Sequence, residues 1–230
     1  MVSKSYQTVS DALQLFYVFD PCEPNYDYSP SIAEFWGVVS SFAFLLVPLI
    51  GRNSPPRTAR CYYSLILVGI CSSIHHMYLN SVSQFFDELS ILIAELNFLY
   101  SMRVELAPKI LFFLGLCIVL GLFHALPLGL AVFYLLCVIM ADALRIAKQH
   151  EKHLSGVMTI VSIAILASVF FCFADVLLCP SVARWYLHPG WHIAMAIFCY
   201  FGGSCLARIE KLEMAKGVEL VHKRHLDQFN

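Results

Sequence analysis

Apolar residues fill most of this chain in seven long runs, which are separated by short stretches rich in charged residues, Pro or Gly. The runs lie at about residues 32 to 50, 61 to 80, 84 to 102, 109 to 123, 125 to 146, 156 to 178 and 187 to 207. Most approach the roughly 20 residues with which an α-helix crosses the hydrocarbon core of a bilayer. The pattern therefore predicts an all-α integral membrane bundle of seven transmembrane helices.

Composition strengthens the membrane interpretation. The 230 residues are 59% hydrophobic and 13% charged, whereas charged residues make up about 25% of a soluble domain. The net charge of -1 and the dispersed basic residues argue against a nucleic-acid partner. We expect an N-terminal segment at 1–31, a seven-helix domain at 32–207 and a basic tail at 208–230.

The distribution of Lys and Arg predicts how the bundle is oriented. Thirteen of the fifteen lie in the first, third and fifth loops and in the tail, and only Lys4 and Arg184 lie in the alternate segments. By the positive-inside rule the N-terminus is lumenal or external and the C-terminus is cytosolic. This orientation requires an odd number of spans, and seven satisfies it.

Five polar or ionisable residues lie in or beside the apolar runs, where unpaired polar groups are costly. The predicted topology places all of them at the lumenal end of the bundle. They are Ser72, His76, Asp87, His188 and His192. Residues with unrelated roles would not be expected to share one layer.

Three of the five are histidines, which suggests a metal site. His188 and His192 are one helical turn apart, so one helix can offer two ligands to one metal ion, and His76 supplies a third. Three neutral nitrogens with an open fourth position are typical of catalytic zinc. His75 points about 100° away around the same helix, and we do not expect it to be a ligand of this site.

The other polar residues have alternatives that the sequence leaves open. Ser72 faces the same side as His76, but a serine in a membrane helix also commonly bonds to its own backbone. Asp87 suits proton transfer at a metal site, or is a solvated charge, which is our interpretation of Glu88. Glu95 and Asp175 are functional candidates because they lie within the membrane, although hydrogen bonding between helices explains them equally well.

The segment DPCEPNYDYSPSIAEF before the first span is rich in oxygen ligands. Such a loop, stiffened by prolines, suits a hard cation such as calcium. It lacks the glycine and the terminal glutamate spacing of an EF-hand. From the pattern alone, a polar loop at the membrane interface is the simpler interpretation.

These motifs taken together resemble a known family. DPCEPNY, AEFW, a Ser and a His four residues apart, FFDEL, an Asp and a Cys four residues apart, and HPGWH occur in this order. The set closely resembles the alkaline ceramidases, which belong to a superfamily of seven-span membrane hydrolases that also includes the adiponectin and progestin receptors.

The resemblance implies an activity, two metals and a set of site residues. It implies hydrolysis of ceramide to sphingosine and a free fatty acid in an endoplasmic reticulum or Golgi membrane, with the active site toward the lumen. It places catalytic zinc on His76, His188 and His192, and the catalytic roles on Ser72 and Asp87. It places calcium on Asp20, the carbonyl of Pro21, Glu23, Asn25 and Glu34, and a disulfide between Cys22 and Cys179.

Two other functions remain as alternatives to the hydrolase. One is a seven-span receptor of the adiponectin or progestin type, which is expected to have a cytosolic N-terminus. The other is a transporter or proton channel that uses the intramembrane carboxylates as a relay. The clustering of the ionisable residues in one layer, instead of across the membrane, disfavours the relay.

Overall fold

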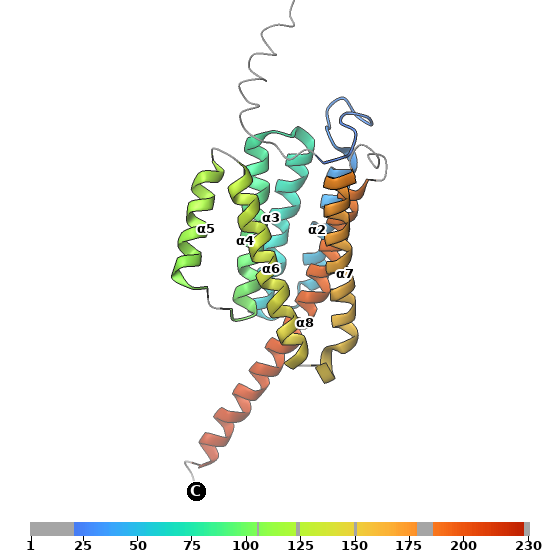
Figure 1. The fold of residues 1–230 in the computed structure, drawn as a ribbon. Coiled ribbons are helices and arrows are strands. Elements are labelled where there is room, and N and C mark those ends of the chain that lie inside the picture. Colours follow the sequence, from blue (N-terminus) through green and yellow to red (C-terminus); the bar gives the residue numbers. More distant parts are fainter. Residues whose placement is uncertain (1–20, 105, 123–124, 150, 179–185, 228–230) are drawn as a thin grey trace, which may run out of the picture.

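The computed structural model describes residues 21–104, 106–122, 125–149, 151–178 and 186–227, which form seven α-helices and no strand (Figure 1). The helices are α2 (Phe35–Gly51), α3 (Pro56–Tyr78), α4 (Ser81–Ser101), α5 (Pro108–Gly121), α6 (Ala125–Gln149), α7 (Glu151–Leu178) and α8 (Leu187–Asp227). Each of the seven apolar runs corresponds to one helix, which confirms the all-α prediction.

Two segments are long and apolar enough to cross a membrane by themselves, Gly156–Asp175 and Leu187–Ala215. Three shorter apolar segments lie in α2, α5 and α6. Large apolar side chains also cover the outer surface, where Phe112, Leu166 and Leu177 are 75%, 69% and 72% exposed. Exposed apolar area of this extent is typical of a surface that faces lipid or a partner. Seven spans and their orientation stay predictions.

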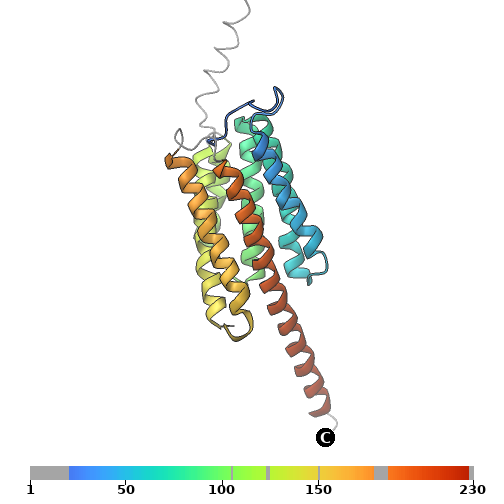
Figure 2. The same cartoon turned by 90° about the vertical axis from the view of Figure 1, so that its right-hand side faces the viewer.

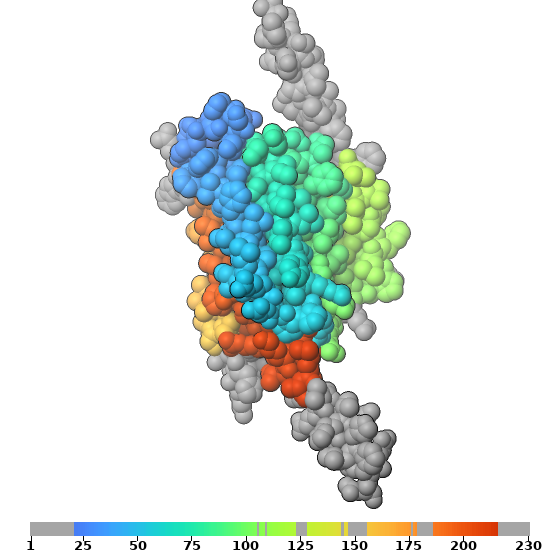
Figure 3. Space-filling view, turned by 180° about the vertical axis from the view of Figure 1, so that it is seen from behind, coloured from blue at the N-terminus to red at the C-terminus, as the bar shows by residue number. Residues whose placement is uncertain are grey.

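Six of the helices form a closed ring. α2 packs on α3, α3 on α4, α4 on α6, α6 on α7, α7 on α8, and α8 returns to α2 and α3. α5 packs mainly against α6 and lies at the side of the ring (Figures 1 and 2). Residues 21–34 cover one end of the ring beside α2 and α3 (Figure 3). The ring encloses the core, so side chains from distant parts of the chain meet inside it.

A tight turn between α3 and α4 positions two of the candidate site residues. α3 ends at Tyr78, and its C-cap, Leu79, has a φ of 42° and donates its backbone N–H to the His75 carbonyl. Asn80 then begins α4 with a capping box, in which its side chain accepts from the Ser83 backbone N–H. The turn brings the last residues of α3, including His76, close to the first turns of α4, including Asp87.

The last helix does not end where the apolar run ends. The run stops near 207, but α8 continues to Asp227 and extends beyond the rest of the bundle (Figure 1). Residues 208–227 are rich in Glu, Lys and Leu and contain no Pro, so their helix propensity is high. The predicted basic tail is therefore helical over the described residues.

Polar contacts join α8 to α3 at the end of the bundle opposite the histidines. The Thr58 backbone N–H and hydroxyl donate to Glu210 Oε2 at 3.0 and 2.8 Å, and the Arg57 backbone N–H donates to Glu210 Oε1 at 3.0 Å. These bonds satisfy N–H groups in the first turn of α3, which have no partner within the helix. These bonds fix the position of α8 along the axis of α3. They therefore also fix the level at which His188 and His192 lie relative to His76.

Candidate metal centre and active site

Three histidines from two helices meet inside the ring. Within the described residues, His76 of α3 and His188 and His192 of α8 are the one group of three or more His, Cys, Asp or Glu side chains whose ligand atoms all lie within 4.8 Å of one another. All three are buried. The ring centroids of His76 lie 5.0 Å from His188 and 4.9 Å from His192. The predicted set of three histidines is confirmed as a group that fits a metal ion.

The spacing of the histidine nitrogens fits zinc. His76 Nε2 and His192 Nε2 are 3.3 Å apart. Two nitrogens that each lie about 2.0–2.1 Å from a tetrahedral zinc ion are separated by about 3.3–3.4 Å. Two neutral imidazoles whose lone pairs face each other at this distance repel unless a cation lies between them.

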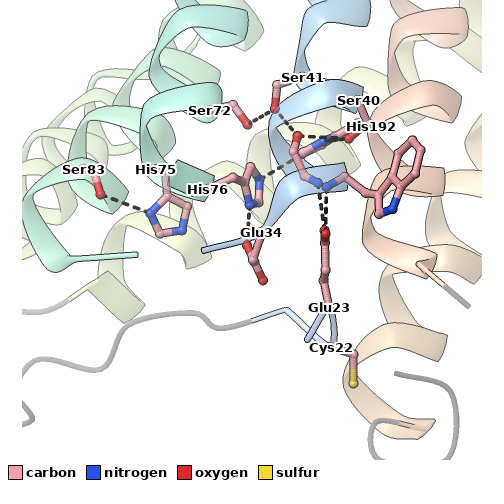
Figure 4. Close-up of polar contacts among 12 residues, drawn as sticks. Cys22, Glu23, Glu34, Ser40, Ser41, Ser72, His75, His76, Ser83 and His192 are labelled. Atoms are coloured by element: carbon pink, nitrogen blue, oxygen red, sulfur yellow. Dashed lines mark hydrogen bonds and ion pairs between the residues drawn. The ribbon is translucent and has the colours of Figure 1, made fainter. Parts of the chain in front are cut away.

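The remaining ring nitrogens of two histidines are held by Glu34, the N-cap of α2, and by Ser40 of α2 (Figure 4). His76 Nδ1 lies 2.6 Å from Glu34 Oε2, and His192 Nδ1 lies 2.7 Å from Ser40 Oγ. Ser40 donates its own hydroxyl hydrogen to the Gly37 carbonyl at 3.1 Å, so it accepts from His192. A proton on each Nδ1 leaves both Nε2 lone pairs directed toward the metal position.

Backbone pairing places the Glu34 carboxylate beside His76. The Ala33 and Glu34 N–H groups donate to the Met77 and His76 carbonyls at 3.1 and 2.9 Å. Carbonyls in the last turn of a helix have no partner within it, so the segment before α2 satisfies the end of α3. Glu34 is buried as a result.

A glycine in α2 makes room for the His76 ring. A Cβ atom on Gly37 would lie 2.8 Å from both Cγ and Nδ1 of His76. No larger residue fits this position without moving the ring.

Asp175 of α7 supports the other two ligands through the start of α8. Its carboxylate accepts hydrogen bonds from the backbone N–H groups of His188 and, at 3.3 Å, Cys22. The first N–H groups of a helix have no intrahelical partner, so Asp175 caps α8 from a neighbouring helix. Pro189 lies in the first turn of α8, where its missing N–H is tolerated. HPGWH therefore forms a regular helical start.

A cavity of about 240 Å³ opens beside the histidines. His76 and His188 line it together with Asp87 and Glu88 of α4. Asp87 is buried, and its Oδ1 has no hydrogen-bond partner within the described residues. Our interpretation of Glu88 as a solvated charge is wrong, because its Oε2 is buried in the same region and its Oε1 accepts from Gln84 Nε2 at 2.8 Å.

Ser72 lies one helical turn below His76 on α3 and lines a second, adjoining cavity. It is buried, and its Oγ lies 3.1 Å from Ser41 Oγ. Ser41 has a single hydroxyl hydrogen, and the shorter of its two contacts, at 2.8 Å, is to the Gly37 carbonyl. Ser72 therefore lies in hydrogen-bond contact with Ser41 and at the wall of the cavity.

The predicted calcium residues lie at the same end of the bundle as the histidines. Glu23 caps α2, since the Trp36 and Gly37 N–H groups donate to its Oε1 and Oε2 at 2.7 and 2.8 Å (Figure 4). Burial raises the pKa of Glu23, and these two bonds oppose the rise.

The other residues of the predicted calcium site are only partly described. Pro21 and Asn25 lie in the same loop as Glu23. Asp20 lies outside the described residues, and so does Cys179, the predicted disulfide partner of Cys22. Calcium binding and the disulfide stay predictions.

The sequence did not predict the contacts made by α2 and Asp175. Glu34 was expected only as a calcium ligand, and Ser40, Ser41 and Gly37 were not singled out. A signal existed, because Glu34, Gly37, Ser40 and Ser41 recur every three to four residues and form one small, polar face on an otherwise apolar helix. Such a face indicates contact with polar groups inside the bundle.

Comparison with known proteins identifies the family of this chain. Residues 18–226 match the family model described as Ceramidase. Alkaline ceramidase 1 of Mus musculus is 27% identical over 234 residues, which covers 88% of this chain and 84% of the mouse protein. An alkaline ceramidase of Drosophila melanogaster is 29% identical, covering 79% and 73%, and one of Arabidopsis thaliana is 24% identical, covering 80% and 78%. The family match spans nearly the whole chain, histidines included, and shows that this protein belongs to the alkaline ceramidase family of enzymes.

Proposed function

We propose that the protein is an intramembrane, zinc-dependent amidase that hydrolyses ceramide to sphingosine and a free fatty acid. The observation that carries this proposal is the three-histidine group, which opens onto a cavity that also contains an unpaired carboxylate oxygen of Asp87. The names of the related enzymes supply the substrate class. The match to the ceramidase model favours the hydrolase over the receptor alternative.

His76, His188 and His192 would hold the zinc ion, and Glu34 and Ser40 would keep two of these rings in the required tautomer. When bound, zinc would supply Lewis-acid activation of a water molecule and of the amide carbonyl. The burial of His76 and His192 would exclude bulk water from this position and strengthen electrostatic interactions there.

Asp87 would move the proton. Its unpaired Oδ1 accepts the proton of the attacking water and later delivers it to the nitrogen of the leaving sphingoid amine. Asp87 lines the same cavity as His76 and His188, which supports this role.

Ser72 would donate a hydrogen bond to the oxyanion of the tetrahedral intermediate. One preorganised donor of this kind contributes about 3–4 kcal/mol at well-built sites. The position of Ser72 in the cavity wall, one helical turn from His76, supports this role.

The hydrocarbon chains would occupy the interior of the ring. A mostly apolar cavity lined by Ser72 and residues such as Val68, Val132 and Phe198 adjoins the histidine site. Its apolar wall suits a lipid tail.

Calcium and the disulfide would act at a distance from the reaction. Calcium bound by Asp20, the Pro21 carbonyl, Glu23, Asn25 and Glu34 would hold the N-terminal segment against the bundle. A bond between Cys22 and Cys179 would join the same segment to the end of α7, which requires an oxidising lumen. We place the protein in an endoplasmic reticulum or Golgi membrane with this end toward the lumen, in accord with the positions of Lys and Arg.

The test is hydrolysis of a fluorescent-acyl ceramide by the purified protein, with and without a zinc chelator, beside His188→Ala. We expect activity to be lost in the variant and after complete zinc removal, and to return when zinc is added back to the wild-type protein. His75→Ala is the matched control for zinc content, because His75 is a buried neighbour outside the three-histidine group. Full activity without zinc, or in His188→Ala, would contradict the mechanism.

A separate titration tests the calcium site. Asp20→Ala is expected to abolish any increase in activity or thermal stability that calcium gives the wild-type protein. An identical response in both proteins would remove the N-terminal calcium site while leaving the zinc mechanism intact.

A further inference from the structure

Three cavities follow one another through the interior of the ring. The histidine cavity and the second cavity share Ile91, Val132, Leu136 and Trp191 in their walls. The second and a third cavity share Phe98, Ile139 and Phe198. The third extends to Met102, Leu206 and Ile209, near the opposite end of the bundle. The three cavities therefore lie in a row from the histidines along the helix axes, and the path that this row marks suits a hydrocarbon chain.

Below Ser72, a single acidic or basic side chain lies on the walls of this path within the described residues. It is Glu95 of α4, in the wall of the second cavity. The third cavity is lined by apolar residues and cysteine only. Eight residues separate Glu95 from Asp87 along α4, which places Glu95 about 12 Å deeper in the bundle.

Glu95 is buried and lacks a hydrogen-bond partner for one oxygen. The residue is 7% exposed, and its Oε2 is fully buried without a partner within the described residues. Buried polar atoms are nearly always hydrogen-bonded, and a carboxyl group in an apolar wall is unfavourable without a partner. The other donors in that wall are Ser72, Trp191 and Cys199, and none of them bonds to Oε2, so the partner that fits is a polar group on the molecule that fills the cavity.

We propose that Glu95 binds a hydroxyl group carried part-way along one hydrocarbon chain of the lipid substrate. The proposal rests on the ceramidase function proposed above and adds a preference for chain-hydroxylated substrates. A hydroxyl group both donates and accepts, so it pairs with a carboxyl group in either protonation state. It also carries no charge, so it enters an apolar cavity more readily than an ammonium group.

The depth of Glu95 specifies where the hydroxyl group lies. One leaflet of a bilayer contributes about 15 Å of hydrocarbon, and Glu95 is about 12 Å below Asp87 along α4. A hydroxyl group next to the amide carbonyl, or on the head of the sphingoid base, would stay near the histidines. Glu95 therefore selects a hydroxyl group near the middle of a chain.

The experiment compares three ceramides of equal acyl length. One has a plain acyl chain, one a hydroxyl group next to the carbonyl, and one a hydroxyl group near the middle of the chain. We expect kcat/KM of the full-length protein to be about tenfold or more higher for the mid-chain hydroxyl, because a site built to bond a hydroxyl group discriminates against ligands that lack it. In Glu95→Leu, the ratio of kcat/KM for the mid-chain hydroxyl substrate to kcat/KM for the plain substrate is expected to fall to about one. Glu95→Gln should retain part of the preference for the hydroxyl substrate.

Met195→Leu is the matched control, because it changes an apolar residue of the same wall and should keep the wild-type ratio. Thermal unfolding separates binding from a structural role. Glu95→Leu should unfold at the same or a higher temperature, since it removes an unpaired buried oxygen, whereas loss of a structural contact would lower that temperature.

A binding measurement keeps this proposal separable from the catalytic one. The measurement is the rise in melting temperature that a fatty acid gives the protein. In the wild-type protein, a mid-chain hydroxy fatty acid should give a larger rise than the plain fatty acid, and in Glu95→Leu this difference should be smaller. If no ceramide is hydrolysed but this difference is present, the amidase function fails and the Glu95 site stands. Equal ratios and equal melting shifts in the wild-type protein and Glu95→Leu would overturn the Glu95 proposal.

Discussion

The zinc-facing nitrogens of His76 and His192 depend on side chains that do not touch the metal position. Glu34 and Ser40 hold the two Nδ1 atoms at 2.6 and 2.7 Å. Ser40 has one role that the geometry defines, because it accepts from His192 and donates to the backbone of its own helix. Removing its hydroxyl therefore changes one ring and leaves the fold in place.

Ser40→Ala should weaken zinc binding by about 10–100-fold, the usual effect of losing a residue that orients a metal ligand. The measurement is the zinc Kd by competition with a chromogenic chelator. Ser73→Ala is the control, because its hydroxyl donates to the Gly69 carbonyl of its own helix in the same manner. Equal zinc affinities in the two variants would show that the Ser40 contact does not support the metal.

Gly37→Ala should displace His76. The added methyl group would lie 2.8 Å from the ring, and His76 is 1% exposed, so the ring has little space in which to move. We expect purified Gly37→Ala to contain less zinc and to hydrolyse ceramide more slowly. Gly115→Ala adds a methyl group with nothing within 4 Å of it and should match the wild-type protein. Normal zinc content in Gly37→Ala would mean that α2 shifts at little cost.

At the scale of elements, the site depends on where helices begin and end. α3 ends two residues after His76, and α4 begins with a capping box at Asn80 and Ser83. The backbone of Ala33 and Glu34 completes the end of α3, and the Glu23 carboxylate completes the start of α2. Helix ends with unpaired backbone groups are costly, so the same bonds that stabilise the helices also position the site.

Asn80→Ala should lower the free energy of unfolding by about 1 kcal/mol, the typical cost of losing an N-cap. The measurement is unfolding of the detergent-solubilised protein by heat or denaturant. Asn97→Ala is the control, because Asn97 bonds to the Ile93 carbonyl within α4 and caps no helix. A loss in Asn97→Ala as large as that in Asn80→Ala would contradict the capping role.

At the scale of the whole molecule, the two ends of the bundle differ in chemistry. The histidines, Asp87 and residues 21–34 gather at one end, while Arg57 and Arg103 contact Glu213 of α8 at the other. The segment that begins at residue 21 and the end of α8 lie at opposite ends of the bundle (Figure 1). This arrangement suits a protein whose termini lie on opposite sides of a membrane.

An N-glycosylation acceptor added before residue 1 should be modified in cells, and one added after residue 230 should not. The reason is the concentration of Lys and Arg on the side that holds the C-terminus. The measurement is a glycosidase-sensitive shift in electrophoretic mobility. Modification at the C-terminus alone would reverse the predicted orientation and favour the receptor alternative.

Much of this architecture was predictable because it is encoded locally. Long apolar runs with polar boundaries predicted each of the seven helices, and the intramembrane histidines predicted the group that fits a metal. The burial of the Glu88 Oε2 atom was not predictable, because it depends on how α4 packs against α6. The length of α8 was not predicted either. Hydropathy marks where the apolar run ends, near residue 207, but the residues beyond it still have high helix propensity and continue the helix.

The sequence by itself determined the all-α class, the family and the identity of the three histidines, because residue type and periodicity are properties of short segments. Only the tertiary structure decided which side chains support those histidines. Glu34 lies 42 residues from His76 in the chain, and Ser40 lies 152 from His192. Such pairs are fixed by the packing of α2 between α3 and α8. The packing of α4 likewise decides that Glu95 lines an interior cavity. No local pattern records that packing, since it follows from the burial of all the helices at once.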